Sequence, residues 1–154
     1  MSKAAPPDLT VRPMRPGDLP EVMDVWVAAW QAAYPSIDFE ARRGWITNRI
    51  AELERKGSRS LVLLGGGRII GALVVNPETG YVDQIVVGIE VQGFGAADVL
   101  LAEARRLSPA GLDLHVNRDN ARALGFYQKH GFKTVGEDVN PRSGAAVYKL
   151  SWRP

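Results

Sequence analysis

The chain has 154 residues, of which 45% are hydrophobic and 23% are charged, as is usual for one compact globular domain. The 19 basic and 17 acidic side chains give a formal net charge of +2, too small to indicate nucleic-acid binding. There is no cysteine for a disulfide, and no stretch approaches the ~20 apolar residues of a membrane span, so we expect a cytoplasmic protein without a membrane partner.

The N-terminal part predicts an arm, a strand and a helix. Residues 1–8 contain prolines and are expected to form a flexible arm. The segment Leu9–Met14 alternates like a short strand. Asp18, with Glu21 three residues later, has the pattern of a capping box. Apolar residues then recur at helical spacing, which predicts a helix from Asp18 to about Ala33.

A second helix and a hairpin are predicted next. Apolar residues at helical spacing favour a helix over residues 38–56, with Gly57 as its C-terminal cap. Two apolar segments, Arg59–Leu64 and Arg68–Val75, flank three glycines at 65–67. This pattern is typical of a β-hairpin.

The remaining segments complete a mixed α/β pattern. They are a strand over Tyr81–Val87, a helix over Gly93–Leu107, a strand over Gly111–Val116, a helix over about Asp119–His130, a strand from Phe132 and a strand over Ala145–Trp152. The order is therefore β-α-α-β-β-β-α-β-α-β-β. It predicts an α/β (α+β) fold in which a mixed, mostly antiparallel sheet is flanked by helices, with residues 9–154 as one domain.

Between the predicted strand ending at Val87 and the following helix lies Gln92-Gly93-Phe94-Gly95-Ala96-Ala97, which we call the glycine turn. Its small residues allow a ligand to approach the main chain. The first N–H groups of the helix and its dipole suit a pyrophosphate. The same residues would also suit close packing of the helix on the sheet, and the turn alone does not separate the two interpretations.

Two other kinds of glycine loop bind phosphates in proteins. A dinucleotide fingerprint requires a third glycine where this chain has Asp98, although Asp113 stands near the usual position of the ribose-binding acid. The three preceding strands do not fit that topology, so a nicotinamide cofactor is a poor alternative. No Gly-Lys-Ser/Thr follows either glycine cluster, which excludes a P-loop.

Two motifs together resemble the GCN5-related N-acetyltransferase (GNAT) superfamily. The glycine turn matches its Gln/Arg-x-x-Gly-x-Gly/Ala signature. Residues 120–127, read as Asn-Ala-Arg-Ala-Leu-Gly-Phe-Tyr, match its Asn-x-x-Ala-x-x-Phe-Tyr signature and are followed by Gly131-Phe132. The chain departs from the family where a basic residue often follows the first glycine, because Phe94 stands there.

The resemblance implies acetyl-CoA as acyl donor, with no metal. The implied donor-binding residues are the main chain of Ile85, Val86 and Val87, the glycine turn (Gln92, Gly93, Phe94, Gly95, Ala96 and Ala97) and Asn120. Asn120 also suits the N-cap of its helix, for which Asp119 competes. Ile85 and Val87 are in addition expected to place their side chains in the core.

The resemblance makes Tyr127 the candidate acid that protonates the departing thiolate, although it could instead pack its helix on the sheet. His115 and Asp83 are candidate bases for the attacking amine. Strand alternation puts His115 on the polar face of its strand, and imidazole titrates near neutrality. Each of the two could equally be a partly exposed strand residue, and a water relay could replace both.

Trp26, Trp30 and Tyr34 recur four residues apart on one helical stripe. Such a stripe is usually core, but part of it is expected to face the acceptor, an amine of a small molecule or of a protein. The predicted activity is direct acetyl transfer to a primary amine in a ternary complex. The alternative is a non-catalytic acyl-CoA sensor or interaction module. Relatives of this kind are often homodimers, so a homodimer is a further expectation.

Overall fold

The computed structural model describes residues 8–154, so the predicted arm lies outside the described residues except for Asp8. The strands are β1 (Leu9–Pro13), β2 (Arg59–Gly65), β3 (Arg68–Val75), β4 (Val82–Val87), β5 (Leu112–Asn117), β6 (Lys133–Val139) and β7 (Ala146–Trp152). The helices are α1 (Leu19–Ala33), α2 (Arg43–Arg55), α3 (Ala96–Leu107) and α4 (Ala121–Lys129), with short 3-10 turns at Pro16–Asp18, Glu40–Arg42 and Ile89–Val91.

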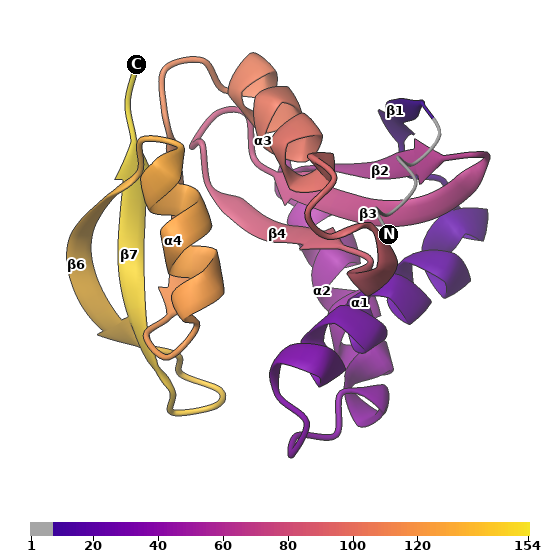
Figure 1. The fold of residues 1–154 in the computed structure, drawn as a ribbon, viewed down its shortest axis with the longest axis horizontal. Coiled ribbons are helices and arrows are strands. Elements are labelled where there is room, and N and C mark those ends of the chain that lie inside the picture. Colours follow the sequence, from indigo (N-terminus) through magenta and orange to yellow (C-terminus); the bar gives the residue numbers. More distant parts are fainter. Residues whose placement is uncertain (1–7) are drawn as a thin grey trace, which may run out of the picture.

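The strands form two antiparallel sheets, one in the order β1-β2-β3-β4 and one in the order β5-β7-β6. A single parallel bridge between Tyr81 and Asp113 joins them, and we call this bridge the seam. Beyond the seam the two sheets diverge, as the courses of β4 and β7 show (Figure 1). The predicted mixed, mostly antiparallel architecture is confirmed, and the division of its sheet at β4 and β5 is the feature that the order of elements does not reveal.

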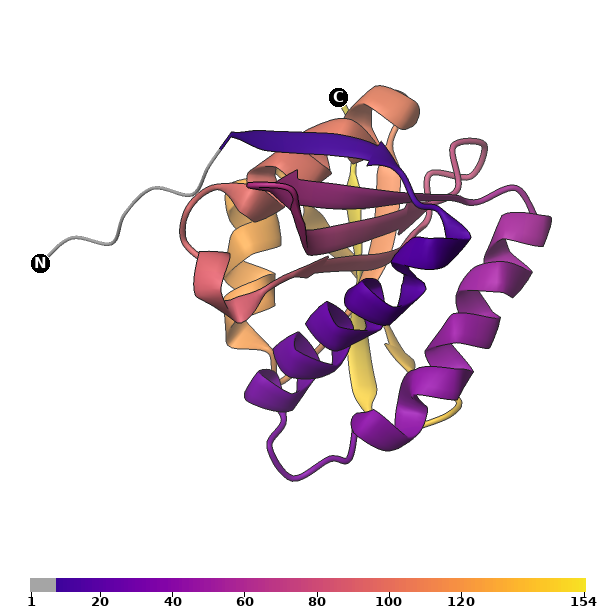
Figure 2. The same ribbon diagram turned by 90° about the vertical axis from the view of Figure 1, so that its right-hand side faces the viewer.

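Helices cover both faces of the first sheet, with α1 and α2 on one face and α3 on the other (Figure 2). Strand alternation explains the two resulting cores. In β2 and β3, Leu63 and Leu73 point toward α3, whereas Val62 and Val74 point toward α1 and α2. Because β3 is buried on both faces, its sequence is a continuous apolar run. The helix α4 packs on the second sheet (Figure 1).

A β-bulge interrupts β4 where it pairs with β3. Val74 lies opposite Gln84 and Val75 opposite Val82, which leaves Asp83 as the extra residue. The bulge lets two consecutive side chains turn toward the first two helices. Asp83 contacts α2 and Gln84 contacts α1.

The seam is held by one close approach of two loops. The backbone N–H of Asp113 donates to the carbonyl of Gly80 at 2.9 Å. Gly80 has φ +77°, and a Cβ there would lie 2.3 Å from the carbonyl oxygen of Gly111. Ser108 Oγ donates to that same oxygen at 2.9 Å. Only glycine fits at position 80 without moving this loop.

The capping box predicted at Asp18 is wrong. The Asp18 side chain caps no N–H of α1. Its carboxylate instead accepts from the backbone N–H of Arg15 at 2.7 Å and pairs with Arg12. This arrangement closes the preceding 3-10 turn, which the capping pattern cannot distinguish from the start of the helix itself.

Two other helices begin later than predicted. A 3-10 turn at Glu40–Arg42 precedes α2, and Asp38 Oδ1 accepts from the N–H of Ala41 within it. Helix α3 begins at Ala96 and not at Gly93, because Gly93 and Gly95 have φ +91° and +80°. A residue with positive φ cannot continue a right-handed helix. Within residues 8–154, no helix has the length and apolar character needed to cross a bilayer.

Candidate functional site

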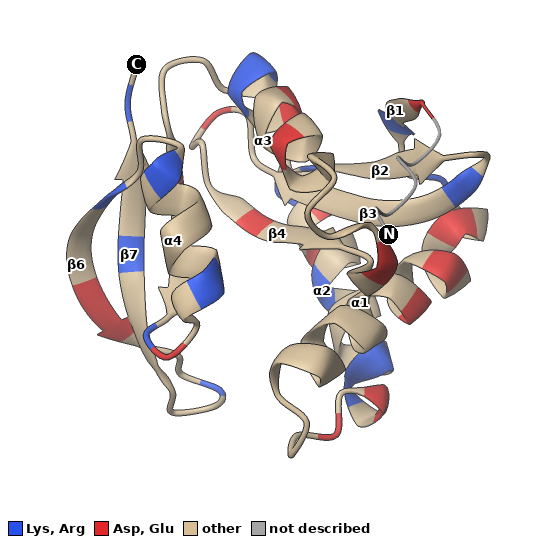
Figure 3. Cartoon of the chain, viewed as in Figure 1, with Lys and Arg blue, Asp and Glu red and all other residues tan. Residues whose placement is uncertain are grey.

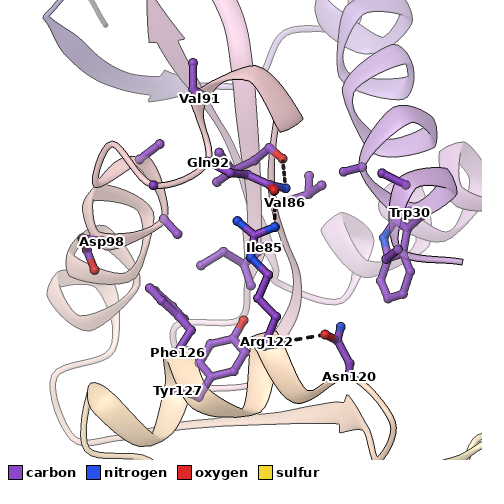
Figure 4. Close-up of a pocket in the computed structure, with 18 of the residues that line it drawn as sticks. Trp30, Ile85, Val86, Val91, Gln92, Asp98, Asn120, Arg122, Phe126 and Tyr127 are labelled. Atoms are coloured by element: carbon purple, nitrogen blue, oxygen red, sulfur yellow. Dashed lines mark hydrogen bonds between the residues drawn. The ribbon is translucent and has the colours of Figure 1, made fainter. Parts of the chain in front are cut away.

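A large groove of about 980 Å³ opens where the two sheets diverge. Its walls come from β4, the glycine turn, α3, α4 and the C-terminal end of α1 (Figure 4). Residues named from the sequence that line it are Trp30, Tyr34, Ile85, Val86, Val87, Gln92, Gly93, Gly95, Ala96, Ala97, Asn120 and Tyr127. Phe94 is the residue of the glycine turn that stays outside this lining. Residues of both sequence motifs therefore line the same groove.

The glycine turn presents main-chain groups to the groove. The left-handed conformations of Gly93 and Gly95 bring the chain into α3, and no side chain caps the helix at Gly95. The first-turn N–H groups of a helix have no intrahelical partners, and the helix dipole adds partial positive charge there. Ala96 and Ala97 have side chains too small to cover these groups. The arrangement can accept an anion such as a pyrophosphate.

Arg122 is a groove residue that the sequence did not single out. It lies at a variable position of the second motif, on the first turn of α4, and its guanidinium contacts Gln92 Oε1 across the groove. Gln92 Nε2 in turn donates to the carbonyl of Val87 at 3.4 Å. The turn itself lacks a basic residue at Phe94, and α4 supplies one from the opposite wall (Figure 4).

Helix α4 carries the other two predicted groove residues. Asn120 Oδ1 accepts from the N–H of Ala123 at 3.2 Å, so Asn120 is the N-cap of the helix. Tyr127 is buried against Phe126 and Phe132, and burial raises its pKa. Its hydroxyl points into the groove toward Ile85 (Figure 4). Both side chains thus have a packing or capping role and also reach the groove.

The aromatic stripe of α1 divides between core and groove. Trp26 is only 4% exposed, and its Nε1 donates to Gln84 Oε1 at 3.0 Å. Trp30 stacks on Tyr34 with ring centroids 5.9 Å apart. The Tyr34 hydroxyl donates to Asp119 Oδ1 at 2.7 Å, which ties the end of α1 to the start of α4. The structure brings Trp30 and Tyr34 to the edge of the groove and leaves Trp26 in the core.

The Asp83 carboxylate is fully engaged. It receives two hydrogen bonds from Arg49, at 3.0 Å from Nε and 2.5 Å from Nη2, and a third from Gln84 Nε2 at 3.1 Å. Its side chain is 5% exposed. The ion pair raises the pKa of Arg49. In this structure the Asp83 carboxylate therefore serves as the partner of Arg49 and Gln84.

His115 lies on the other side of the seam, within a second cavity of about 420 Å³. Its Nδ1 lies 2.7 Å from the Tyr81 hydroxyl, and its Nε2 lies 3.9 Å from Asp138 Oδ2. Burial raises the pKa of Tyr81 to about 12. The alternation of the sequence predicted that His115 lies on the polar face of its strand. The contact with Tyr81 depends on how β4 and β5 meet, which no local pattern specifies.

A model of the acetyltransferase (GNAT) family matches residues 19–132, which include both motifs. A peptidyl-lysine N-acetyltransferase of Salmonella typhimurium is 36% identical over 67 residues, 44% of this chain and 44% of that protein. A mycothiol acetyltransferase of Clavibacter michiganensis is 33% identical over 131 residues, 77% of this chain and 42% of that protein. Each match therefore spans less than half the length of the relative.

Among solved structures, the fold is similar to a PaiA N-acetyltransferase from Thermoplasma acidophilum in complex with coenzyme A. The TM-score is 0.79 at 18% identity, with 96% of this chain and 99% of that one covered. Identity this low bears on the fold alone. The similarity therefore extends over nearly the whole fold of both chains.

Proposed function

Because the chain belongs to the acetyltransferase (GNAT) family, we propose that it transfers an acetyl group from acetyl-CoA to a primary amine by direct attack in a ternary complex. One observation carries the proposal. The anion-accepting glycine turn and the hydroxyl of Tyr127 open into the same groove. A donor whose phosphates lie at the turn would extend along β4 toward that hydroxyl.

The groove offers distinct groups to each part of the donor. The N–H groups at the start of α3 would bind the pyrophosphate, with the guanidinium of Arg122 as the nearby cation. The main chain of β4 at Ile85–Val87 would pair with the pantetheine amides. Because Asn120 uses its Oδ1 for the cap, its Nδ2 would serve as a further donor to the arm.

The chemistry that we propose is a single acyl transfer. The amine nitrogen attacks the carbonyl carbon of the thioester, the new C–N bond forms and the C–S bond breaks. Tyr127 donates its proton to the departing thiolate, and the amine loses a proton to a base. The products are the N-acetyl amine and free CoA. General acid catalysis by a positioned phenol fits a group that stays protonated at neutral pH.

For the base we propose His115 in preference to Asp83. The Asp83 carboxylate already accepts three hydrogen bonds, whereas His115 can accept a proton at Nε2 when its Nδ1–H donates to the Tyr81 oxygen. The second cavity, which His115 lines, would then hold the acceptor. The two relatives are named for peptidyl-lysine and for mycothiol, which are different acceptors, so the names do not identify the acceptor of this chain.

A thiol-release assay tests the proposal. Purified protein with acetyl-CoA should release free CoA thiol only when a suitable amine is added, and mass spectrometry should find the acetylated amine. A thermal-shift comparison of CoA with NAD accompanies it, and stabilisation by NAD alone would contradict the proposal. Stabilisation by CoA without acetylation of any amine in a broad library would favour a non-catalytic acyl-CoA sensor instead.

A further inference from the structure

The second cavity is lined by elements from both sides of the seam. It lies between α2, the start of β4, β5 and the turn that joins β6 to β7. Its volume of about 420 Å³ is within the range of small-molecule sites. Tyr81 and His115 form one part of its wall, and Arg49 and Arg142 form another.

Arg142 is a cation without an acidic partner in this wall. Its guanidinium carbon lies 3.6 Å from the centroid of the Trp45 ring, and that of Arg49 lies 5.9 Å from the same centroid. Arg49 is paired with Asp83. Within residues 8–154, Arg142 has no carboxylate at ion-pair distance. A stacked guanidinium of this kind keeps its N–H edge available for a planar anion.

The electrostatic surroundings of Arg142 favour an incoming anion. Burial and the neighbouring charges of Arg49 and Arg42 lower the pKa of Arg142, and the Asp83 carboxylate offsets only part of this effect. An anion bound at the guanidinium would relieve the repulsion. Figure 3 shows basic residues both at the N-terminal end of α2 and on the β6–β7 turn.

The opposite part of the cavity wall carries an acidic side chain. Asp138 places a carboxylate oxygen 3.9 Å from His115 Nε2. A carboxylate next to an imidazole attracts an ammonium group, and the imidazole can accept a proton from that group. The cavity thus has a cationic region and an acid–imidazole region. A ligand with one positive and one negative end fits both.

We propose that this cavity is the acceptor site and that it selects small amines that also carry a carboxylate, with the carboxylate at Arg142 and the amine toward His115. The proposal deepens the acetyl transfer inferred above and depends on it for the reaction. Binding of the acceptor can be tested without it. Arg142 is then a specificity residue that contacts the acceptor and does not contact the donor.

Matched pairs of acceptors test this preference. In the thiol-release assay at saturating acetyl-CoA, β-alanine and γ-aminobutyrate are each compared with their amides, which retain the amine and lose the charge. We expect kcat/KM to be about tenfold or more higher for the carboxylates, as is typical of a charge-assisted contact. Arg142→Gln should remove most of this ratio by raising KM for the carboxylates, with KM for acetyl-CoA unchanged.

The matched control is Arg118→Gln. The Arg118 guanidinium also lies over an aromatic ring, 5.2 Å from the centroid of Tyr148, but it lines neither the large groove nor the second cavity. Its substitution should leave the ratio intact. Equal rates with carboxylates and amides, a preference for diamines or for lysine peptides without a nearby carboxylate, or an unaltered ratio in Arg142→Gln would each overturn the proposal.

Calorimetric binding to the protein–CoA complex gives a readout that needs no turnover. The carboxylates should bind more tightly than their amides in the wild-type chain and in Arg118→Gln, and the difference should disappear in Arg142→Gln. This result would support the acceptor site even if no acetyl transfer were found, in which case the proposed function alone would fail. Equal binding of both members of each pair would contradict the acceptor site whatever the rates.

Discussion

At the scale of single residues, the hydroxyl of Tyr127 combines a buried ring with access to the large groove. The ring is fixed between Phe126 and Phe132, at centroid distances of 5.2 Å from each. Burial disfavours the phenolate and so raises the pKa of the hydroxyl. A fixed phenol that stays protonated is suited to donate to a developing thiolate, and this suitability follows from packing that also serves the fold.

We predict that Tyr127→Phe lowers kcat by about 100-fold or more, in the range typical of lost general acid catalysis. The Kd for CoA should change by less than about twofold, since the ring and its packing remain. Because the pKa of this phenol is raised, its proton is present throughout the neutral range, and the wild-type rate should show no loss from its ionisation below about pH 10. Steady-state kinetics from pH 6 to about pH 10 measure both effects.

Tyr148→Phe is the control for this substitution, because Tyr148 lies on β7 outside the groove lining. It should retain the wild-type rate. A Tyr127→Phe enzyme with unchanged kcat would show that the thiolate leaves without this proton.

At the scale of elements, the start of α4 performs two tasks with one side chain. Asn120 caps the helix through Oδ1 and lies at the groove with its Nδ2. The Tyr34 hydroxyl occupies Asp119, so that neighbour does not compete for the cap. The two tasks use different atoms and can therefore be separated by substitution.

We predict that Asn120→Ala lowers the free energy of unfolding by about 1 kcal/mol and also weakens CoA binding. Asn120→Ser, which retains a capping oxygen, should keep the stability while the Kd for CoA rises about three- to tenfold through loss of one hydrogen bond. Urea denaturation and calorimetry measure the two quantities. If the serine variant binds CoA as the wild type does, Asn120 has only the capping role.

Local patterns in the sequence predicted these elements, because each pattern depends only on residues of the same element. The alternation in β5 and the helical spacing in α1 depend on neighbours a few residues away. The two motifs likewise placed most of the groove. The capping box failed because Asp18 pairs with Arg12, a partner in the preceding strand. Arg122 and Tyr81 were missed because their partners, Gln92 and His115, lie about 30 residues away or more and meet them only through the tertiary fold.

At the scale of the whole molecule, two sheets meet at one bridge. The seam depends on the approach of Gly80 to Gly111 and on the hydrogen bond from Asp113 N–H to the Gly80 carbonyl. Each sheet contributes a different wall of the large groove: β4 belongs to the first sheet, and α4 packs on the second. The angle at the seam therefore sets the width of the groove.

We predict that Gly80→Ala lowers the free energy of unfolding by about 1–3 kcal/mol more than Gly67→Ala, which is the matched control. Both glycines have nearly the same φ, +77° and +78°, but a Cβ at position 67 meets no atom within 4 Å. The shared conformational penalty of about 1–2 kcal/mol cancels in the comparison. Urea denaturation of the two variants measures the difference, and equal losses would mean that the loops at the seam move apart without strain.

The division of the sheet also has a mechanical consequence. The two sheets share one hydrophobic cluster but only one backbone bridge, and we expect such a joint to bend more easily than one continuous sheet. An elongated ligand that contacts both walls of the groove would fix the angle between the two sheets. Part of the binding free energy then offsets the entropy lost when this angle becomes fixed. The same angle sets the distance between His115 in the second sheet and Asp83 in the first. Binding on one side of the seam would in this way also change the affinity on the other side, in addition to the direct contact that acyl transfer requires between the two bound molecules.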